Sequence, residues 1–344
     1  MGVRAFRDVI VVGASAGGVV ALRTLVGDLP ADLPASVFVV LHIPPGGRTQ
    51  LPQILERAGR LPAVQAADGT SIERGKLYVA APGAHMLLKR DRIRHTFGPR
   101  VNGHRPAIDP LFRSAAQVFG PRVIGVILSG SLDDGTAGLA SIKARGGMAV
   151  VLDPADASYP GMPRSAIESV AVDHISPLLN LGALLDRLSR EEVIDERGDQ
   201  VDEYVDVTEQ DPLLAGRTMP GLPSEISCPE CSGTLYEVDA ENVTRFECHV
   251  GHSFSPEALV DGQANALEGA LWTALRTLEE SALLAHRMVH RMNKRGSERA
   301  AGRFAEKERE LRARAEVVRG ALLDSDPGPR ANEESDTGGI RSIS

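Results

Sequence analysis

Residues 8–18 read Asp8-Val-Ile-Val-Val-Gly-Ala-Ser-Ala-Gly-Gly18, an apolar run followed at once by a glycine-rich turn. The run Asp8–Val12 predicts a buried β-strand, because it is continuously apolar and rich in valine. From Gly18 to Val26 the apolar residues recur at helical spacing, which predicts a helix directly after the turn. A strand that turns sharply into a helix is typical of an open α/β sheet.

Other short runs rich in valine and isoleucine extend this pattern. They occupy residues 36–42, 76–80, 123–128 and 148–152. Unbroken apolar strands separated by helical patterns are typical of a parallel sheet covered on both faces. The sequence therefore predicts a three-layer α/β/α domain over residues 1–190, with a mainly parallel, doubly wound sheet.

Composition narrows the class of protein. The chain has 344 residues, three cysteines and a formal net charge of -8. So few cysteines exclude a disulfide framework and indicate a reducing compartment. No apolar run approaches the ~20 residues of a membrane span, and the N-terminus lacks the apolar stretch of a secretory signal. We therefore expect a cytoplasmic protein without membrane insertion and without a nucleic-acid partner.

The charge is unevenly distributed, and this divides the chain. Residues 1–190 carry 21 Lys or Arg against 15 Asp or Glu, a net charge of +6. From Glu191 to Asp211 there are ten acidic residues against one arginine, a net charge of -9. A short acidic stretch with few large apolar residues is typical of a solvated linker. We predict an acidic linker over residues 191–222.

The turn Gly13-Ala-Ser-Ala-Gly17 is the first candidate for chemistry. It lacks the second glycine of a dinucleotide-binding turn and the Gly-Lys-Ser/Thr of a P-loop, but it fits G-x-S-x-G. In that motif the serine projects above the sheet, beside helix-start N–H groups that can stabilise an oxyanion. Ser15 is thus a candidate nucleophile. A serine in a tight turn or a phosphate-binding loop stays an alternative.

Two further strand ends supply partners for a nucleophile. His42 ends the predicted strand 36–42, and Asp133 and Asp134 follow the strand 123–128. Each has a plain structural interpretation, as a core histidine or as a turn before a helix. Because the carboxyl ends of parallel strands meet at one edge of a sheet, together they predict a Ser/His/Asp triad. The residues alone do not choose between the two aspartates.

Several motifs together resemble a known family, the bacterial chemotaxis protein-glutamate methylesterases of the CheB type. They follow in family order over residues ~7–190, roughly half of the chain. The matching pieces are Gly13–Gly18, Leu41–Pro45, Tyr78–Gly83 with His85, Arg105–Phe112, Ser129–Gly135 and Gly161–Pro163.

The resemblance implies residue roles and a reaction. Ser15 would be the nucleophile, His42 the general base and acid, and Asp134 the residue that orients the histidine. The oxyanion and substrate loop would include Ala16, Ser131, Arg105 and Met162. The implied reaction hydrolyses glutamate γ-methyl esters on the cytoplasmic helices of chemoreceptors, and deamidates receptor glutamine, without a catalytic cofactor.

Two departures from the family pattern stand out. The family commonly has Thr-Gly-Met-Gly where this chain has Ser129-Gly-Ser-Leu132, which alters the loop beside the oxyanion. The first strand also begins within ten residues of Met1, so we expect no receiver domain before it. Control by phosphorylation of such a domain is then not expected within this chain.

The chain beyond the linker contains every cysteine. Cys228 and Cys231 form a C-x2-C pair, and Cys248 and His252 form C-x3-H after a gap of sixteen residues. Three thiols and one imidazole at this spacing predict a structural zinc ion that folds a small zinc-ribbon-like module over residues 223–256. His249 is an alternative fourth ligand, and a redox pair or reduced cysteines without a role are alternatives to zinc.

The last segments predict helices and a tail. Apolar residues recur every three or four positions from Leu267 to Met292 and from Ala301 to Leu322. They predict a helical hairpin over residues 257–323, followed by a disordered tail over 324–344. Residues 286–319 carry eleven Lys or Arg against five Glu. That charge indicates a solvated face, or an arm that packs on the acidic linker or an acidic receptor and gates Ser15.

Three functions follow from these features. The first is a receptor methylesterase. The second is a serine esterase or amidase acting on another protein or a small ester. The third is a catalytically weak signalling adaptor that binds a partner through the zinc module. The complete Ser/His/Asp set favours an enzyme.

Overall fold

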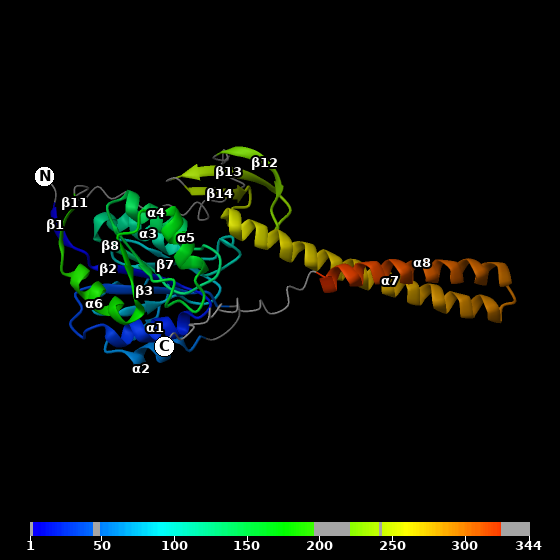
Figure 1. Cartoon of the computed structure of the whole chain (residues 1–344), viewed down its shortest axis with the longest axis horizontal. Helices are drawn as coiled ribbons and strands as arrows, with labels where there is room; N and C mark the ends of the chain where they lie inside the picture. The colour runs from blue at the N-terminus through cyan, green and yellow to red at the C-terminus, as the bar shows by residue number, and fades with distance from the viewer. Residues whose placement is uncertain (1–2, 44–48, 196–220, 241–242, 325–344) are drawn as a thin grey trace, which may run out of the picture. The chain divides into compact units, whose positions relative to one another are not determined.

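The computed structural model describes residues 3–43, 49–195, 221–240 and 243–324. The chain divides into two compact units, of which the first extends to Gly262 and the second begins at Gln263. Figure 1 labels many of the elements in both units.

The first unit is built on a seven-stranded sheet in which all neighbouring strands are parallel. In spatial order the strands are β10 (His174–Ser176), β9 (Met148–Leu152), β8 (Val123–Ile127), β2 (Val9–Ala14), β3 (Ser36–Leu41), β5 (Leu77–Val79) and β4 (Ala63–Gln65). The five strands predicted from apolar runs are β2, β3, β5, β8 and β9. The predicted parallel, doubly wound sheet is therefore confirmed.

Helices cover both faces of this sheet, as Figure 1 shows. One face carries α1 (Gly18–Asp28), α2 (Leu51–Ala58) and α6 (Leu178–Ser189). The other carries α3 (Ile108–Phe119), the 3-10 turn η1 (Gly120–Arg122), α4 (Thr136–Ala144) and α5 (Gly161–Ser169). The three-layer α/β/α architecture is confirmed.

Strand β2 explains why its sequence is continuously apolar. Successive side chains on a strand point to opposite faces of the sheet. Ile10 and Val12 pack in the core beneath α1, whereas Val9 and Val11 pack in the core beneath α3. Because both faces are covered by helices, every position of the strand is buried.

The strand order also contains a switch point. From β2 the chain moves outward through β3, and it later returns to β8 on the other side of β2. Ligands bind outside the carboxyl ends of the strands at such a switch point. Ser15, His42 and the segment 129–134 follow the ends of β2, β3 and β8.

Two small antiparallel pairs complete the domain. They are β6 (His85–Leu88) with β7 (Ile93–Thr96), and β1 (Val3–Phe6) with β11 (Glu192–Asp195). The second pair corrects the predicted linker over residues 191–222, since residues 192–195 form a strand whose Val193 is buried opposite Ala5. The count of charges gave no sign of this alternation. Residues 196–220 of the predicted linker lie outside the described residues.

A smaller antiparallel sheet follows within the first unit. It consists of β12 (Leu222–Ser227), β13 (Thr234–Ala240), β14 (Val243–Cys248) and β15 (Ser253–Phe254). Its buried residues are Cys228, Leu235, Cys248, Phe254 and Leu259. Leu259 lies on α7 (Pro256–Lys294), so the first turns of this helix belong to the core of the module.

The second unit contains the rest of α7 and α8 (Glu298–Asp324). Leu275 of α7 packs with Ala315 and Leu322 of α8, and Ala282 packs with Leu311, which makes the two helices a hairpin. The helical hairpin is thus present as predicted, while residues 325–344 of the predicted tail lie outside the described residues. In the described part of the chain, no helix is both long and apolar enough to cross a bilayer.

Candidate active site

Ser15 lies in the turn between β2 and α1. Gly17 has a φ of +72°, and a Cβ atom there would lie 2.8 Å from Ser129 Oγ, so both conformation and space require glycine. The Ser15 N–H donates to the Ser129 carbonyl at 2.9 Å, which ties the turn to the end of β8. This turn leaves Ser15 half-buried at the carboxyl edge of the sheet.

His42 connects Ser15 to Asp134. Its Nδ1 lies 3.1 Å from Ser15 Oγ, and its Nε2 lies 2.7 Å from Asp134 Oδ2. The imidazole is 7% exposed and the carboxyl 3% exposed. The three strand ends thus place these side chains in one continuous hydrogen-bonded chain.

The tautomer of His42 follows from its partners. An ionised carboxylate only accepts hydrogen bonds, so the short contact to Asp134 assigns the proton to Nε2. Nδ1 then presents its lone pair to the Ser15 hydroxyl. The ring nitrogens are used in the opposite sense from chymotrypsin-type triads, in which Nε2 faces the serine. Either arrangement allows the imidazole to take a proton from the serine.

Asp134 is held as a carboxylate. Burial alone would raise the pKa of this carboxyl, but the hydrogen bond and charge of His42, with the Ile108 N–H, lower it well below its usual range. The Ile108 N–H donates to Oδ2 at 2.7 Å, and Asn102 Nδ2 donates to Oδ1 at 2.9 Å. The carboxylate is therefore ionised and fixed in orientation.

The neighbouring Asp133 points elsewhere. Its Oδ1 accepts a hydrogen bond of 2.6 Å from Ser255 Oγ. Burial raises the pKa of Asp133 to about 8, against the opposing hydrogen bond from Ser255. Of the two aspartates that the sequence left open, only Asp134 therefore contacts His42 with its side chain.

Two of the residues predicted beside the oxyanion are Ala16, in the turn after Ser15, and Met162, at the start of α5. The Ala16 carbonyl accepts from Ser129 Oγ at 2.8 Å, which anchors the Ala16–Gly17 peptide next to Ser15. Met162 is fully buried, and its N–H donates to the Gly130 carbonyl at 2.9 Å. A Cβ at Gly130 would lie 2.0 Å from Met162 Sδ and 2.9 Å from Ser15 Cβ. The methionine therefore packs directly behind the loop that borders Ser15.

Ser131 and Arg105 are more peripheral. Ser131 is exposed on the same loop, where its Cα would be 3.2 Å from a Cβ at Gly161. The Arg105 guanidinium donates to the carbonyls of Phe97 and Gly98, at 2.9 and 2.7 Å. The structure thus shows Arg105 bracing a loop rather than contacting Ser15.

Two residues beside the triad were missed from the sequence. The His104 ring stacks on His42, with ring centroids 3.7 Å apart, and Asn102 donates to Asp134. Burial, followed by the neighbouring His42, lowers the pKa of His104 to about 4, so this ring is neutral. Their only sequence signal is their place in Val101-Asn-Gly-His104, immediately before the Arg105-Pro106 motif.

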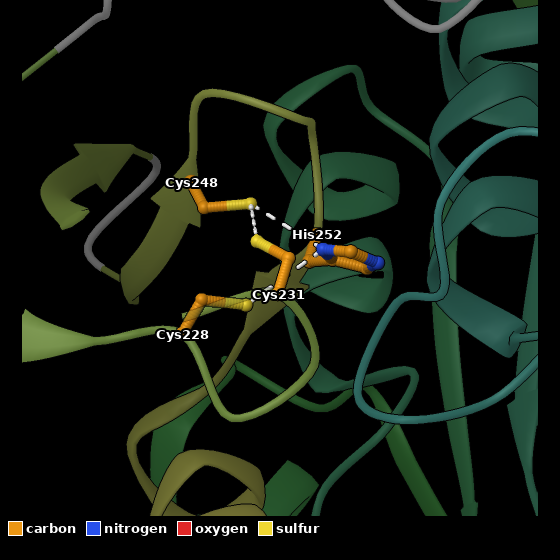
Figure 2. A group of neighbouring side chains, drawn as sticks. All are labelled: Cys228, Cys231, Cys248 and His252. Atoms are coloured by element: carbon orange, nitrogen blue, oxygen red, sulfur yellow. Dashed lines mark hydrogen bonds between the residues drawn. The ribbon is translucent and has the colours of Figure 1, made fainter. Parts of the chain in front are cut away.

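A second cluster lies in the small antiparallel sheet. Cys228, Cys231, Cys248 and His252 converge so that their ligand atoms all lie within 4.8 Å of one another (Figure 2). Cys231 Sγ is 3.6 Å from Cys248 Sγ, and His252 Nδ1 is 3.4 Å from Cys248 Sγ. These four side chains could hold a metal ion. His249, the alternative ligand, is exposed and outside the cluster.

The fold and the first site together define a class: a doubly wound α/β/α protein with a serine-hydrolase type of site at its switch point. A model of the CheB methylesterase family matches residues 10–185, more than half of the chain. The chain therefore belongs to the CheB methylesterase family.

Individual relatives agree with this assignment. The chain is 39% identical over 184 residues to a Leptospira interrogans protein provisionally named protein-glutamate methylesterase/protein-glutamine glutaminase, covering 53% of this chain and 95% of that protein. It is 36% identical over 180 residues to the protein-glutamate methylesterase/protein-glutamine glutaminase 2 of Methanosarcina mazei, covering 50% of this chain and 49% of that relative.

One solved structure is also similar. The crystal structure of the Thermotoga maritima CheB methylesterase catalytic domain aligns with a TM-score of 0.52 and 31% identity, covering 53% of this chain and 98% of the other. The likeness is thus to the sheet domain. The strands β12–β15 with the first turns of α7, called the Cys3His module below, and the hairpin are additions to it.

Proposed function

We propose that this chain is a serine hydrolase that removes methyl esters from glutamate γ-carboxyls on the cytoplasmic helices of chemoreceptors. The hydrogen-bonded series Ser15–His42–Asp134 at the switch point carries the proposal. The names of the similar proteins supply the substrate class, and they extend the proposal to deamidation of receptor glutamine. Because such receptor helices are cytoplasmic, a cytoplasmic location is part of this proposal.

The proposed reaction uses side chains of this chain and water. Ser15 Oγ attacks the ester carbonyl while its proton passes to His42 Nδ1. Asp134 holds the Nε2–H tautomer and stabilises the imidazolium. The Ala16 N–H, in the turn just before α1, then stabilises the oxyanion. Methanol leaves with the proton from His42, and water hydrolyses the acyl-enzyme by the reverse proton path.

The flanking residues have supporting roles in this proposal. Met162 fixes the position of Gly130 behind Ser15, and the exposed Ser131 on the same loop meets the substrate. Arg105 braces the loop at Phe97 and Gly98. Its effect on catalysis is then indirect, through the backbone that leads to Asn102.

We further propose that the Cys3His cluster binds a structural Zn²⁺ ion. Zn–S bonds of about 2.3 Å and Zn–N bonds of about 2.0 Å in a tetrahedron place ligand atoms about 3.5–3.8 Å apart. The contacts of 3.4, 3.6 and 3.7 Å between pairs of these ligands are close to that spacing. Burial raises the pKa of the Cys228 thiol to about 12, so zinc binding would displace its proton.

The central test measures methanol. Full-length protein is incubated with radiomethylated receptor membranes, and volatile methanol is collected for the native protein and Ser15→Ala. Loss of the nucleophile lowers the rate by about 10³-fold or more. Ser71→Ala, at an exposed serine distant in sequence from the triad, is the matched control and keeps the full rate.

A second substrate separates the alternative functions. Ser15-dependent hydrolysis of p-nitrophenyl acetate without methanol release would replace the receptor proposal with an esterase of other specificity. Zinc-dependent capture of a partner without any hydrolysis would identify an adaptor instead.

A further inference from the structure

The segment 100–104 contacts two members of the triad from one short stretch of chain. Asn102 Nδ2 donates to Asp134 Oδ1 at 2.9 Å, and the His104 ring stacks on His42. Asn102 is 7% exposed, and its φ of +51° lies in the left-handed region that asparagine tolerates better than most residues. The position of this segment therefore affects both the carboxylate and the imidazole.

The Cys3His module holds this segment by backbone pairing. The Asn102 N–H donates to the Ser253 carbonyl at 2.8 Å, and the Ser253 N–H donates to the Arg100 carbonyl at 3.4 Å. Val101 and Ser253 form a parallel bridge. Ser253, the first residue of β15, thus pairs with the segment 100–104 as a neighbouring strand would.

The module also fixes the direction of the Asn102 amide. The Ser255 N–H donates to Asn102 Oδ1 at 2.9 Å, so the carbonyl end of this amide must face the module. Its NH₂ end then faces Asp134, and it also lies 3.3 Å from Asp109 Oδ2. Reversal of the amide would place its oxygen against the Asp134 carboxylate, and two acceptors repel one another. The Ser255 N–H of the module thus determines that the NH₂ group of Asn102, and not its oxygen, faces Asp134.

The Cys3His cluster lies next to these contacts in the sequence. Ser253 follows His252 directly, and Ser255 Oγ accepts the Ala258 N–H at 3.1 Å as the N-cap of α7. The same hydroxyl donates to Asp133, beside Asp134 in the chain. Ordering of His252 by a metal and of α7 by its cap would therefore both restrain the residues that pair with Asn102.

We infer that Asn102 is a positioning residue for Asp134, and that the Cys3His module holds Asn102 in place and so makes activity depend on the folded module. This inference rests on the proposed Ser15–His42–Asp134 site. The module takes no part in bond breaking. By holding Asn102, the module keeps the Asp134 carboxylate directed at His42. Loss of the module therefore lowers the turnover number rather than substrate affinity.

The test compares Asn102→Ala, Cys248→Ser and the double variant in the full chain. The readout is the Ser15-dependent release of p-nitrophenolate from p-nitrophenyl acetate, in which Ser15 Oγ takes the acetyl group, p-nitrophenolate leaves and water regenerates the serine. Each single change lowers kcat by about 10–100-fold and leaves KM within about twofold, the scale known for residues that orient ligands from the second shell. Asn180→Ala, at an exposed asparagine of α6, keeps the full kcat.

The double variant is the deciding measurement. If the module acts through Asn102, Cys248→Ser causes no further loss once Asn102 is alanine, whereas independent effects would multiply. A multiplied loss, or an unchanged kcat in Asn102→Ala, would overturn the inference. If Cys248→Ser lowers the melting temperature of the sheet domain, reversible chelation and return of Zn²⁺ replace this variant, in the native protein and in Asn102→Ala. The inference then predicts that chelation causes no further loss of kcat in Asn102→Ala, and a multiplied loss would again overturn it.

This readout is separate from the receptor assay. Ester hydrolysis that depends on Asn102, without methanol release from receptors, would retain the inference and reject the receptor substrate. Methanol release from receptors that does not depend on Asn102 would retain the receptor substrate and reject the inference.

Discussion

The sheet domain and the Cys3His module are stabilised in different ways. The sheet of the first has a buried apolar core on each face, with Ile10 and Val11 of one strand contributing to opposite sides. The core of the module consists of Cys228, Leu235, Cys248, Phe254 and Leu259. So small a core does not offset chain entropy without a metal or a similar constraint. The region that is less able to fold by burial nevertheless holds Asn102 beside the triad.

Removal of the proposed Zn²⁺ ion is expected to produce the largest difference between the two regions. Metal binding contributes about 10–16 kcal/mol to the folding of zinc-finger peptides, so the metal-free module should lose its ordered sheet. Hydrogen exchange followed by mass spectrometry should show fast exchange in β13 and β14 after chelation, and unchanged slow exchange in β2 and β8. Return of Zn²⁺ should restore protection. Protected β13 and β14 amides in the chelated protein would show that the module folds by burial alone.

A core substitution should have the next largest effect, and only on the sheet domain. Phe38 is fully buried, and its ring stacks on Tyr78 with centroids 5.3 Å apart. Phe38→Ala should lower the free energy of unfolding by about 3–5 kcal/mol, measured by urea denaturation. Phe97, 75% exposed, is the matched control, and Phe97→Ala should stay within about 0.5 kcal/mol of the native protein. Equal effects would show that the apolar core does not dominate stability here.

The contact between the two regions should show a pH-dependent effect through Asp133. The pKa of this carboxyl is raised to about 8 from 3.8 by burial, with Glu257 and Asp109 nearby. The folded protein therefore keeps a proton that the unfolded chain releases. This stabilisation is complete below about pH 4 and is lost as the pH rises to about 8, at about 1.4 kcal/mol per pH unit for one proton.

Asp133→Asn removes this titration and still offers an oxygen to Ser255. From pH 5 to pH 8, the free energy of unfolding of the native protein should fall relative to that of Asp133→Asn in urea denaturation. Parallel pH profiles for the two proteins would contradict the buried, protonated Asp133.

The predictability of the site differs from residue to residue. Ser15, His42 and the pair Asp133–Asp134 could be found because each follows an apolar strand, and parallel strands end at one edge. The strand-end position alone did not choose Asp134, which only the family resemblance implied, because adjacent residues in a turn point in different directions. Asn102 had no sequence signal beyond its place before the Arg105-Pro106 motif, since its role depends on Ser255, a residue 153 positions away.

The fold shows the same division. Strands β2, β3, β5, β8 and β9 were predictable because burial on both faces requires continuous apolar runs. The three-residue strands β4 and β10 are too short to show a period. The sequence of strand β11 predicts part of a linker, because its charged residues outnumber its one buried valine.

The sequence by itself determined the layered domain, the candidate nucleophile and histidine, and the four metal-ligand candidates, because each is encoded by local spacing or by the position of a strand end. The tertiary structure decided which aspartate meets His42, that His252 rather than His249 joins the cysteines, and that the module reaches the segment 100–104. These outcomes depend on side-chain direction and on contacts between residues far apart in the chain. Local sequence patterns carry no information about either.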